Sequence, residues 1–169
     1  EIRLWNLPDG RPVSVLVGHR RRIRGLAFVR GTHHLVSGGE DGEVCIWDTD
    51  RTRLIRAMKT PGVPVWGIAV AVVPGLVAAV GEDEYLRIFR MADGELVGEY
   101  AVHRDWVRCV GIAEDGSAVV TGSGDGTVSM WSLRDGSLSL DHTVSDLHFR
   151  VRTVAFTSSG SVVAAGESN

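Results

Sequence analysis

The sequence has very little cysteine and almost no lysine. Its two cysteines among 169 residues are too few and too far apart for a disulfide scaffold or a structural zinc site. Because this use of cysteine is typical of a reducing compartment, we expect a cytoplasmic protein. All but one of the 18 basic residues are Arg, yet the formal net charge is −3. Broad attraction to nucleic acid or to anionic membranes is therefore not expected.

Long helices and membrane spans are not expected either. The uncharged stretch 60–81 is long enough for a membrane helix. However, Pro64 and the Pro74-Gly75 pair interrupt it, and its many valines favour strands, so we interpret it as strand, tight turn and strand. No glycine-rich phosphate loop precedes a helix, and no His, Cys, Asp or Glu cluster has metal-ligand spacing. We expect no metal and no cofactor.

A repeat of 42 residues runs through the chain. Turn acids recur at Asp41, Asp83 and Asp125, 42 residues apart. Aromatic residues near strand ends follow the same spacing, at Trp5, Trp47, Phe89 and Trp131. Two kinds of marker with one period indicate a repeat architecture.

Each unit contains four short segments separated by Gly, Pro or Asp turns, the pattern of four antiparallel strands. In the first full unit we expect strands at 22–28, 34–37, 43–47 and 54–58. Segments such as EVCIW and TVSMW are apolar on both faces, which favours sheets stacked face to face. The sequence therefore predicts an all-β protein.

Gly18-His19, followed by Trp47-Asp48, resembles the WD40-repeat (WD-repeat) family, whose unit is about 40–45 residues long. The resemblance implies a β-propeller with about four blades of four strands, as part of a larger ring of six to eight blades. The expected blades are 1–17 (last strands of one blade), 18–59, 60–101 (a degenerate blade), 102–143, and 144–169 (first strands of the next). The Arg-over-Lys bias also suggests a bacterial multidomain protein, whose full-length chain could hold a catalytic or nucleotide-binding domain.

The resemblance also implies a buried hydrogen-bond network in two units, running from the indole N–H to a hydroxyl, an imidazole and the turn carboxylate. The two sets are His19, Ser37, Asp41, Trp47 and His103, Thr121, Asp125, Trp131. A catalytic triad is the competing interpretation. However, the same kinds of residue recur at the same positions of two repeat units, which favours a structural role. In the middle unit Pro61, Ala79 and Phe89 replace three members together, and Asp83 is expected to remain as a turn residue. In the last unit Leu147 or His148, Ala165 and Asn169 fall near these places.

In WD-repeat propellers partners commonly dock on one rim. When the 42-residue spacing is applied to the positions that form this rim, several of them hold Arg or Trp. The partner-binding residues that this predicts are Arg22, Arg24, Trp66, Trp106, Arg108, Arg150 and Arg152, with Glu40 and Glu82 beside the turns. Arg24, Arg108 and Arg152 are expected to converge toward the central channel with Trp66. Each of these residues could instead be an ordinary solvated or ion-paired side chain.

We therefore expect a non-catalytic scaffold or sensor that binds a protein partner through an acidic or phosphorylated segment of that partner. One alternative is a propeller enzyme with a site at the central channel. The other is nucleic-acid binding through the Arg-rich rim, which the net charge and the single Lys disfavour.

Overall fold

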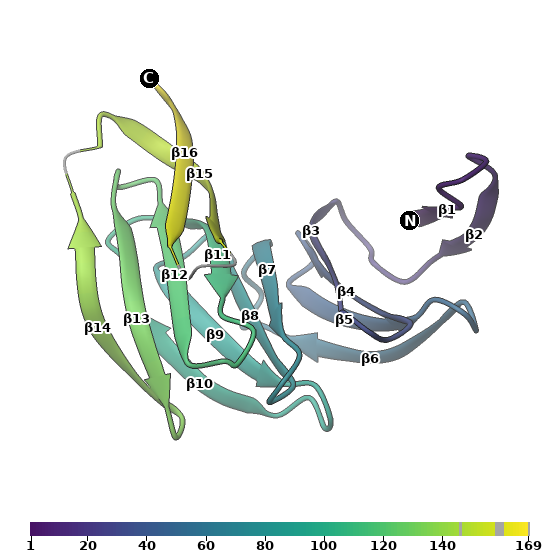
Figure 1. The fold of residues 1–169 in the computed structure, drawn as a ribbon. Coiled ribbons are helices and arrows are strands. Elements are labelled where there is room, and N and C mark those ends of the chain that lie inside the picture. The colour runs from purple at the N-terminus through teal and green to yellow at the C-terminus, as the bar shows by residue number, and fades with distance from the viewer. Residues whose placement is uncertain (146, 158–160, 169) are drawn as a thin grey trace.

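The computed structural model of the chain is an open arc of five antiparallel β-sheets (Figure 1). It describes residues 1–145, 147–157 and 161–168. Within these ranges the chain forms sixteen strands and no helix. None of its described elements is a helix long and apolar enough to cross a membrane.

Three complete sheets of four strands lie between two sheets of two strands. The first short sheet holds β1 (Ile2–Trp5) and β2 (Pro12–Leu16). The complete sheets are β3 (Ile23–Phe28), β4 (His34–Gly39), β5 (Glu43–Asp48), β6 (Arg53–Lys59); β7 (Val65–Ala71), β8 (Leu76–Gly81), β9 (Tyr85–Arg90), β10 (Leu96–Ala101); and β11 (Val107–Ile112), β12 (Ala118–Ser123), β13 (Val128–Arg134), β14 (Ser137–Val144). The last sheet holds β15 (Phe149–Phe156) and β16 (Val162–Ser168).

These sheets confirm the all-β fold that the sequence predicts, and the strands expected in the first full unit differ from β3–β6 by at most two residues. The uncharged stretch 60–81 contains β7 and β8, joined by a turn at Pro74-Gly75. The tight turns after β4 and β12 contain Gly42 and Gly126, each with a positive φ angle. Glycine suits these positions because a residue with a side chain would strain the backbone there.

The core lies between neighbouring sheets. One cluster of buried residues joins the β7–β10 and β11–β14 sheets and includes Ile88, Val107 and Trp131. A second joins the β3–β6 and β7–β10 sheets through residues such as Ile46 and Val77. The second strands β4, β8 and β12 are buried almost throughout. The third strands β5 and β13 are buried over most of their length, which explains why EVCIW and TVSMW are apolar on both faces.

The first strand of each sheet from β3 onward lies on the inner side of the arc. β3 packs against β7, β7 against β11, and β11 against β15. Each of these four strands carries a β-bulge where it pairs with the next strand in its sheet. The residue that the bulge leaves without a partner in the ladder is Arg24, Trp66, Arg108 or Arg152. The four bulges therefore fall on the same position of the repeat.

Candidate partner-binding site

The first complete sheet holds a continuous buried hydrogen-bond network. The Trp47 indole N–H donates to the Ser37 hydroxyl over 2.8 Å, and this hydroxyl lies 2.7 Å from His19 Nε2. The Nδ1 atom of His19 lies 2.9 Å from an Asp41 carboxylate oxygen. Every polar side-chain group of this network thus has a partner if the Ser37 hydroxyl donates to His19 Nε2 and the His19 Nδ1–H donates to Asp41.

Gly18 lets this network close tightly. A Cβ atom at Gly18 would lie 2.6 Å from the Cη2 atom of Trp47, which is too close for any side chain. The equivalent position of the third complete sheet is Val102, and Trp131 is 9% exposed there, against 1% for Trp47. The glycine of the Gly-His pair therefore serves the packing of the indole ring.

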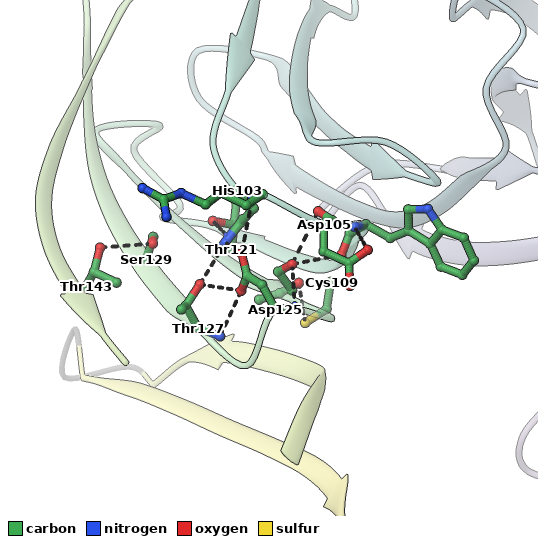
Figure 2. Close-up of polar contacts among 12 residues, drawn as sticks. His103, Asp105, Cys109, Thr121, Asp125, Thr127, Ser129 and Thr143 are labelled. Carbon is green, nitrogen blue, oxygen red and sulfur yellow. Dashed lines mark hydrogen bonds and ion pairs between the residues drawn. The ribbon is translucent and has the colours of Figure 1, made fainter. Parts of the chain in front are cut away.

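The third complete sheet has the same network with one addition. Trp131 donates to the Thr121 hydroxyl over 3.0 Å, and that hydroxyl lies 2.8 Å from His103 Nε2. The nearest partner of His103 Nδ1 is the Thr127 hydroxyl at 2.9 Å, while Asp125 lies 3.3 Å away (Figure 2). Thr127 in turn donates to Asp125 over 2.6 Å, so a hydroxyl stands between the imidazole and the carboxylate.

The pKa values of His103, Asp41 and Asp125 all lie below their ordinary values. Burial is the largest influence on His103 and lowers its pKa, although Asp125 acts in the opposite direction. Burial also acts to raise the pKa of Asp41, but hydrogen bonds from the Arg20 amide and the His19 ring outweigh it, and the pKa falls below its ordinary value. Asp125 behaves likewise, with Thr127 and the Arg104 amide as its main donors.

The hydroxyl groups of both networks are placed for structure and not for nucleophilic attack. Ser37 and Thr121 are fully buried, and each already accepts a hydrogen bond from an indole. A serine-type nucleophile needs an exposed hydroxyl next to its base. The thiols of Cys45 and Cys109 are buried as well, which raises the pKa of each to about 12 and keeps them protonated.

The middle sheet contains a different polar cluster, which the sequence did not reveal. The Arg87 guanidinium, 4% exposed, donates to Asp83 over 2.6 Å and to Glu99 over 2.9 Å. Asp83 also accepts a bond from the Tyr85 amide, as expected of a turn residue. Asp83 thus keeps its place in the turn and, in addition, binds a buried cation. Arg87 stands 42 residues after Cys45, a signal that becomes visible only when the third strands are aligned.

The last unit is described only in part. Of its predicted places, Leu147 is partly buried, while His148 and Ala165 are exposed. Asn169 lies outside the described residues.

Four of the predicted rim residues meet in one pocket. Arg24, Trp66, Arg108 and Arg152 line a hollow of about 240 Å³. They are the four bulge residues of β3, β7, β11 and β15, and a bulge commonly re-aims a side chain at a functional site. The expected convergence of these side chains thus has a backbone cause that the residue spacing alone did not show.

Aromatic contacts hold the centre of this pocket. The Arg108 guanidinium lies 4.9 Å from the centroid of the Trp66 ring and 5.7 Å from that of Trp106. The two indoles meet edge to face, with centroids 5.3 Å apart. Arg24 donates to Glu40 over 2.8 Å. Stacked and bonded in this way, the cations are preorganised in the free chain.

The other predicted rim residues lie outside the pocket lining. Arg22, Glu82 and Arg150 are exposed, and Trp106 is 41% exposed beside Arg108. Backbone bonds fix two of these positions, since the Arg22 carbonyl accepts from the Glu40 amide and the Trp106 carbonyl from the Gly124 amide. We call Arg22, Arg24, Trp66, Trp106, Arg108, Arg150 and Arg152 together the Arg–Trp rim.

Across the ranges that the structure describes, no group of three or more His, Cys, Asp or Glu side chains is placed to hold a metal ion.

Comparison with known proteins gives one family and distant relatives. The family described as WD domain, G-beta repeat matches residues 10–48 and 94–132, two segments that start 84 residues apart. Protein groucho of Drosophila melanogaster is 26% identical over 175 residues, covering 99% of this chain and 24% of groucho. The mouse protein named guanine nucleotide-binding protein subunit beta-like protein 1 is 28% identical over 135 residues, covering 78% of this chain and 41% of the mouse protein.

The chain thus spans less than half the length of either relative. Both relatives are animal proteins, and the expectation of a bacterial source finds no support in them.

Proposed function

The chain belongs to the WD40 repeat family, whose members are typically non-catalytic protein-interaction scaffolds, and we propose that its Arg–Trp rim is where it binds a partner protein. The observation that carries this proposal is the convergence of four bulge residues on one pocket. Arg and Trp are enriched among the residues that dominate binding energy at interfaces. A preorganised cluster of them also loses little side-chain entropy on binding.

The partner segment in this proposal is acidic or phosphorylated. Three Arg side chains and one Trp line the pocket, and the guanidinium fork matches carboxylate and phosphate oxygens. Neither an active site at the channel nor binding of nucleic acid has a comparable observation in its favour, because the buried hydroxyls are already engaged and the chain carries a net charge of −3.

The setting of the module is part of the same proposal. We place it in the cytoplasm, which suits its two free, buried cysteines. We also assign the arc to a larger ring of six to eight blades, with the boundaries expected at 18, 60, 102 and 144. The open arc that the described sheets form supports this assignment, and a compact closed ring of four blades in small-angle scattering would contradict it.

Charge reversal tests the binding face. We expect Arg24→Glu with Arg108→Glu to abolish capture of partner proteins by the full-length protein, measured at a temperature at which circular dichroism shows the variant to be folded. Arg30→Glu with Arg53→Glu is the matched control, because both side chains are largely exposed and lie outside the rim. Equal capture by the two double variants would refute the proposed binding face.

A further inference from the structure

We propose that the outer edge of β14 binds an extended acidic segment of a partner protein as an added strand, with one side chain of that segment entering a pocket beside Trp131. This surface goes beyond the proposed function, because β14 lies on the outside of the arc and contains no residue of the Arg–Trp rim (Figure 1). Three features carry the inference: an open strand edge, a pocket on the same face of the sheet, and two guanidinium groups beside them.

The outer edge of β14 is less protected than those of β6 and β10. β14 pairs with β13 on one side, and no described strand pairs with its other side. Proteins commonly protect such edges with charged side chains or by keeping the strand short. β6 carries three basic residues and β10 has six residues with a glutamate, whereas β14 has eight residues with Asp141 as its one Asp, Glu, Lys or Arg. Its unpaired backbone groups can therefore form a ladder with another strand.

A pocket lies on one face of the sheet next to this edge. Leu140 pairs with Trp131 and Thr143 pairs with Ser129, so these four side chains share a face, and all four line the pocket. Figure 2 shows Ser129 and Thr143 in contact across the two strands. The pocket volume is about 460 Å³, within the roughly 300–1,000 Å³ of ligand pockets. Strand addition uses backbone hydrogen bonds for affinity and such pockets for side-chain specificity.

The repeat explains why this sheet has room for a pocket. The Ser129–Thr143 pair occupies the ladder position that Arg87 and Glu99 occupy in the middle sheet. In the middle sheet two long side chains form an ion pair over 2.9 Å, whereas here two short side chains place their hydroxyls 3.1 Å apart. The shorter side chains leave space beside Trp131.

The lining suits a side chain with an apolar body and a polar tip. Val102, Trp131 and Leu140 provide apolar walls. The hydroxyls of Ser129 and Thr143 bond to each other, and each keeps a lone pair that can accept a further hydrogen bond. Tyrosine meets both conditions, because its ring packs against apolar groups and its hydroxyl donates a hydrogen bond.

Charge favours an acidic segment. Arg104 lines the pocket, and Arg134 pairs with Ser137 at the start of β14. Within the described ranges neither guanidinium forms an ion pair with a carboxylate. Asp141, the acid of β14 itself, already accepts a hydrogen bond from Ser132 over 2.6 Å. A glutamate two residues from the tyrosine shares its face of the added strand and can bind Arg104.

A partner protein fits this edge better than a second copy of the chain. The same edge of a second copy would supply no aromatic side chain, and its one acid is already engaged. The bulge at Asp141 would also interrupt the ladder on both strands of such a pair.

A strand-forming peptide tests the inference on the full-length protein. The probe is blocked Thr-Val-Tyr-Val-Glu-Val, in which the tyrosine and the glutamate share a face. Matched peptides carry alanine for the tyrosine or lysine for the glutamate. By calorimetry we expect a Kd below about 1 mM for the probe, a loss of about tenfold or more with alanine, and a loss of about fivefold with lysine. A Kd above about 1 mM, or equal affinity for all three peptides, would overturn the inference.

Backbone methylation separates strand pairing from filling of the pocket. Alternate N–H groups of an extended strand point to opposite sides, so methylation of one set blocks pairing with β14 and methylation of the other set does not. We expect one methylated probe to lose binding and the other to bind like the parent probe, with slower amide exchange in β14. Retained binding by both methylated probes would rule out an added strand.

Variants locate the site. We expect Leu140→Asp and Thr143→Phe each to weaken probe binding about tenfold, because the first removes an apolar wall and the second fills the pocket. Leu54→Asp is the matched control, since Leu54 pairs with Trp47 on β6 and is likewise exposed. If Leu140→Asp does not fold by circular dichroism, Thr143→Phe, at an exposed position, carries the test. Equal losses in the β14 and β6 variants would contradict the assignment.

Two further measurements separate this surface from its alternatives. Sedimentation of the protein without peptide tests a second copy as occupant: a dimer that Leu140→Asp dissociates and the probe does not would assign the edge to self-association and overturn the inference. Arg24→Glu with Arg108→Glu should bind the probe like the parent protein, whatever its effect on partner capture. Loss of probe binding in that variant would place the peptide on the Arg–Trp rim instead.

Discussion

At the scale of single residues, the hydroxyls of Ser37 and Thr121 each join an indole to an imidazole in the interior of a sheet. We expect Ser37→Ala to lower the free energy of unfolding by about 1–3 kcal/mol, since it leaves the Trp47 N–H and His19 Nε2 without partners. Thr121→Ala should cost a similar amount. Urea unfolding measures both.

The control for this prediction is Ser139→Ala, at an exposed position of β14. It should change the free energy of unfolding by no more than about 0.5 kcal/mol. A loss in Ser37→Ala no larger than that of the control would show that the network contributes nothing to stability.

The pKa shifts in the networks predict how stability depends on pH. The pKa of folded His103 lies below its ordinary value of 6.5, so the unfolded chain binds a proton first as the pH falls. Stability should therefore decline once the pH drops below about 6.5. The lowered pKa values of Asp41 and Asp125 add a second loss below their ordinary value of 3.8.

Urea midpoints at several pH values between 8 and 3 test this prediction. His103→Gln should flatten the profile between pH 7 and 5 while leaving the acidic loss in place, whatever its effect on absolute stability. A parent-like slope in that window for His103→Gln would assign the decline to other groups.

At the scale of elements, the middle sheet shows what its sequence could and could not predict. The 42-residue period, the turns and the strand order could be predicted, because they follow from local residue types that recur at one spacing. The Arg87 cluster could not, since it unites residues of the β8–β9 turn, β9 and β10 that no family motif places together. The bulges were equally hidden, because one unpaired residue in a ladder leaves no mark on an apolar pattern.

Arg87 is the residue on which the middle sheet depends most. We expect Arg87→Met to cost about 3 kcal/mol, the lower end of the range for a broken buried ion pair, because Asp83 and Glu99 keep some contact with water. Arg87→Met combined with Asp83→Asn should recover part of that loss, since it removes one unpaired carboxylate. Urea unfolding of the single and double variants gives both values.

Arg30→Met is the matched control for Arg87→Met. The Arg30–Glu114 pair is exposed on both sides, and such pairs contribute about 0–1 kcal/mol. A cost for Arg87→Met no greater than that of Arg30→Met would mean that the buried cluster is energetically neutral.

At the scale of the whole molecule, stability should decrease from the middle of the arc toward its ends. β8 and β9 lie between two neighbouring sheets and are almost fully buried, whereas β2 is mostly exposed. Leu26 and Phe28 of β3 also remain 54% and 65% exposed. We expect amide hydrogen exchange to be slowest in β8 and β9 and fastest in β1 and β2. Uniform protection along the chain would show instead that the arc unfolds as one unit.

The alternation of the two polar clusters along the arc has a consequence for how the chain avoids misfolding. Neighbouring repeats with the same core are prone to exchange strands, because each can complete the other's sheet. Here the two sheets with the indole–hydroxyl–imidazole network are separated by a sheet built around Arg87. A strand exchanged between neighbours would bury the Arg87 cation away from Asp83 and Glu99, or leave an indole N–H without its hydroxyl. The degenerate repeat thereby makes neighbouring complete sheets chemically different, which disfavours strand exchange between them.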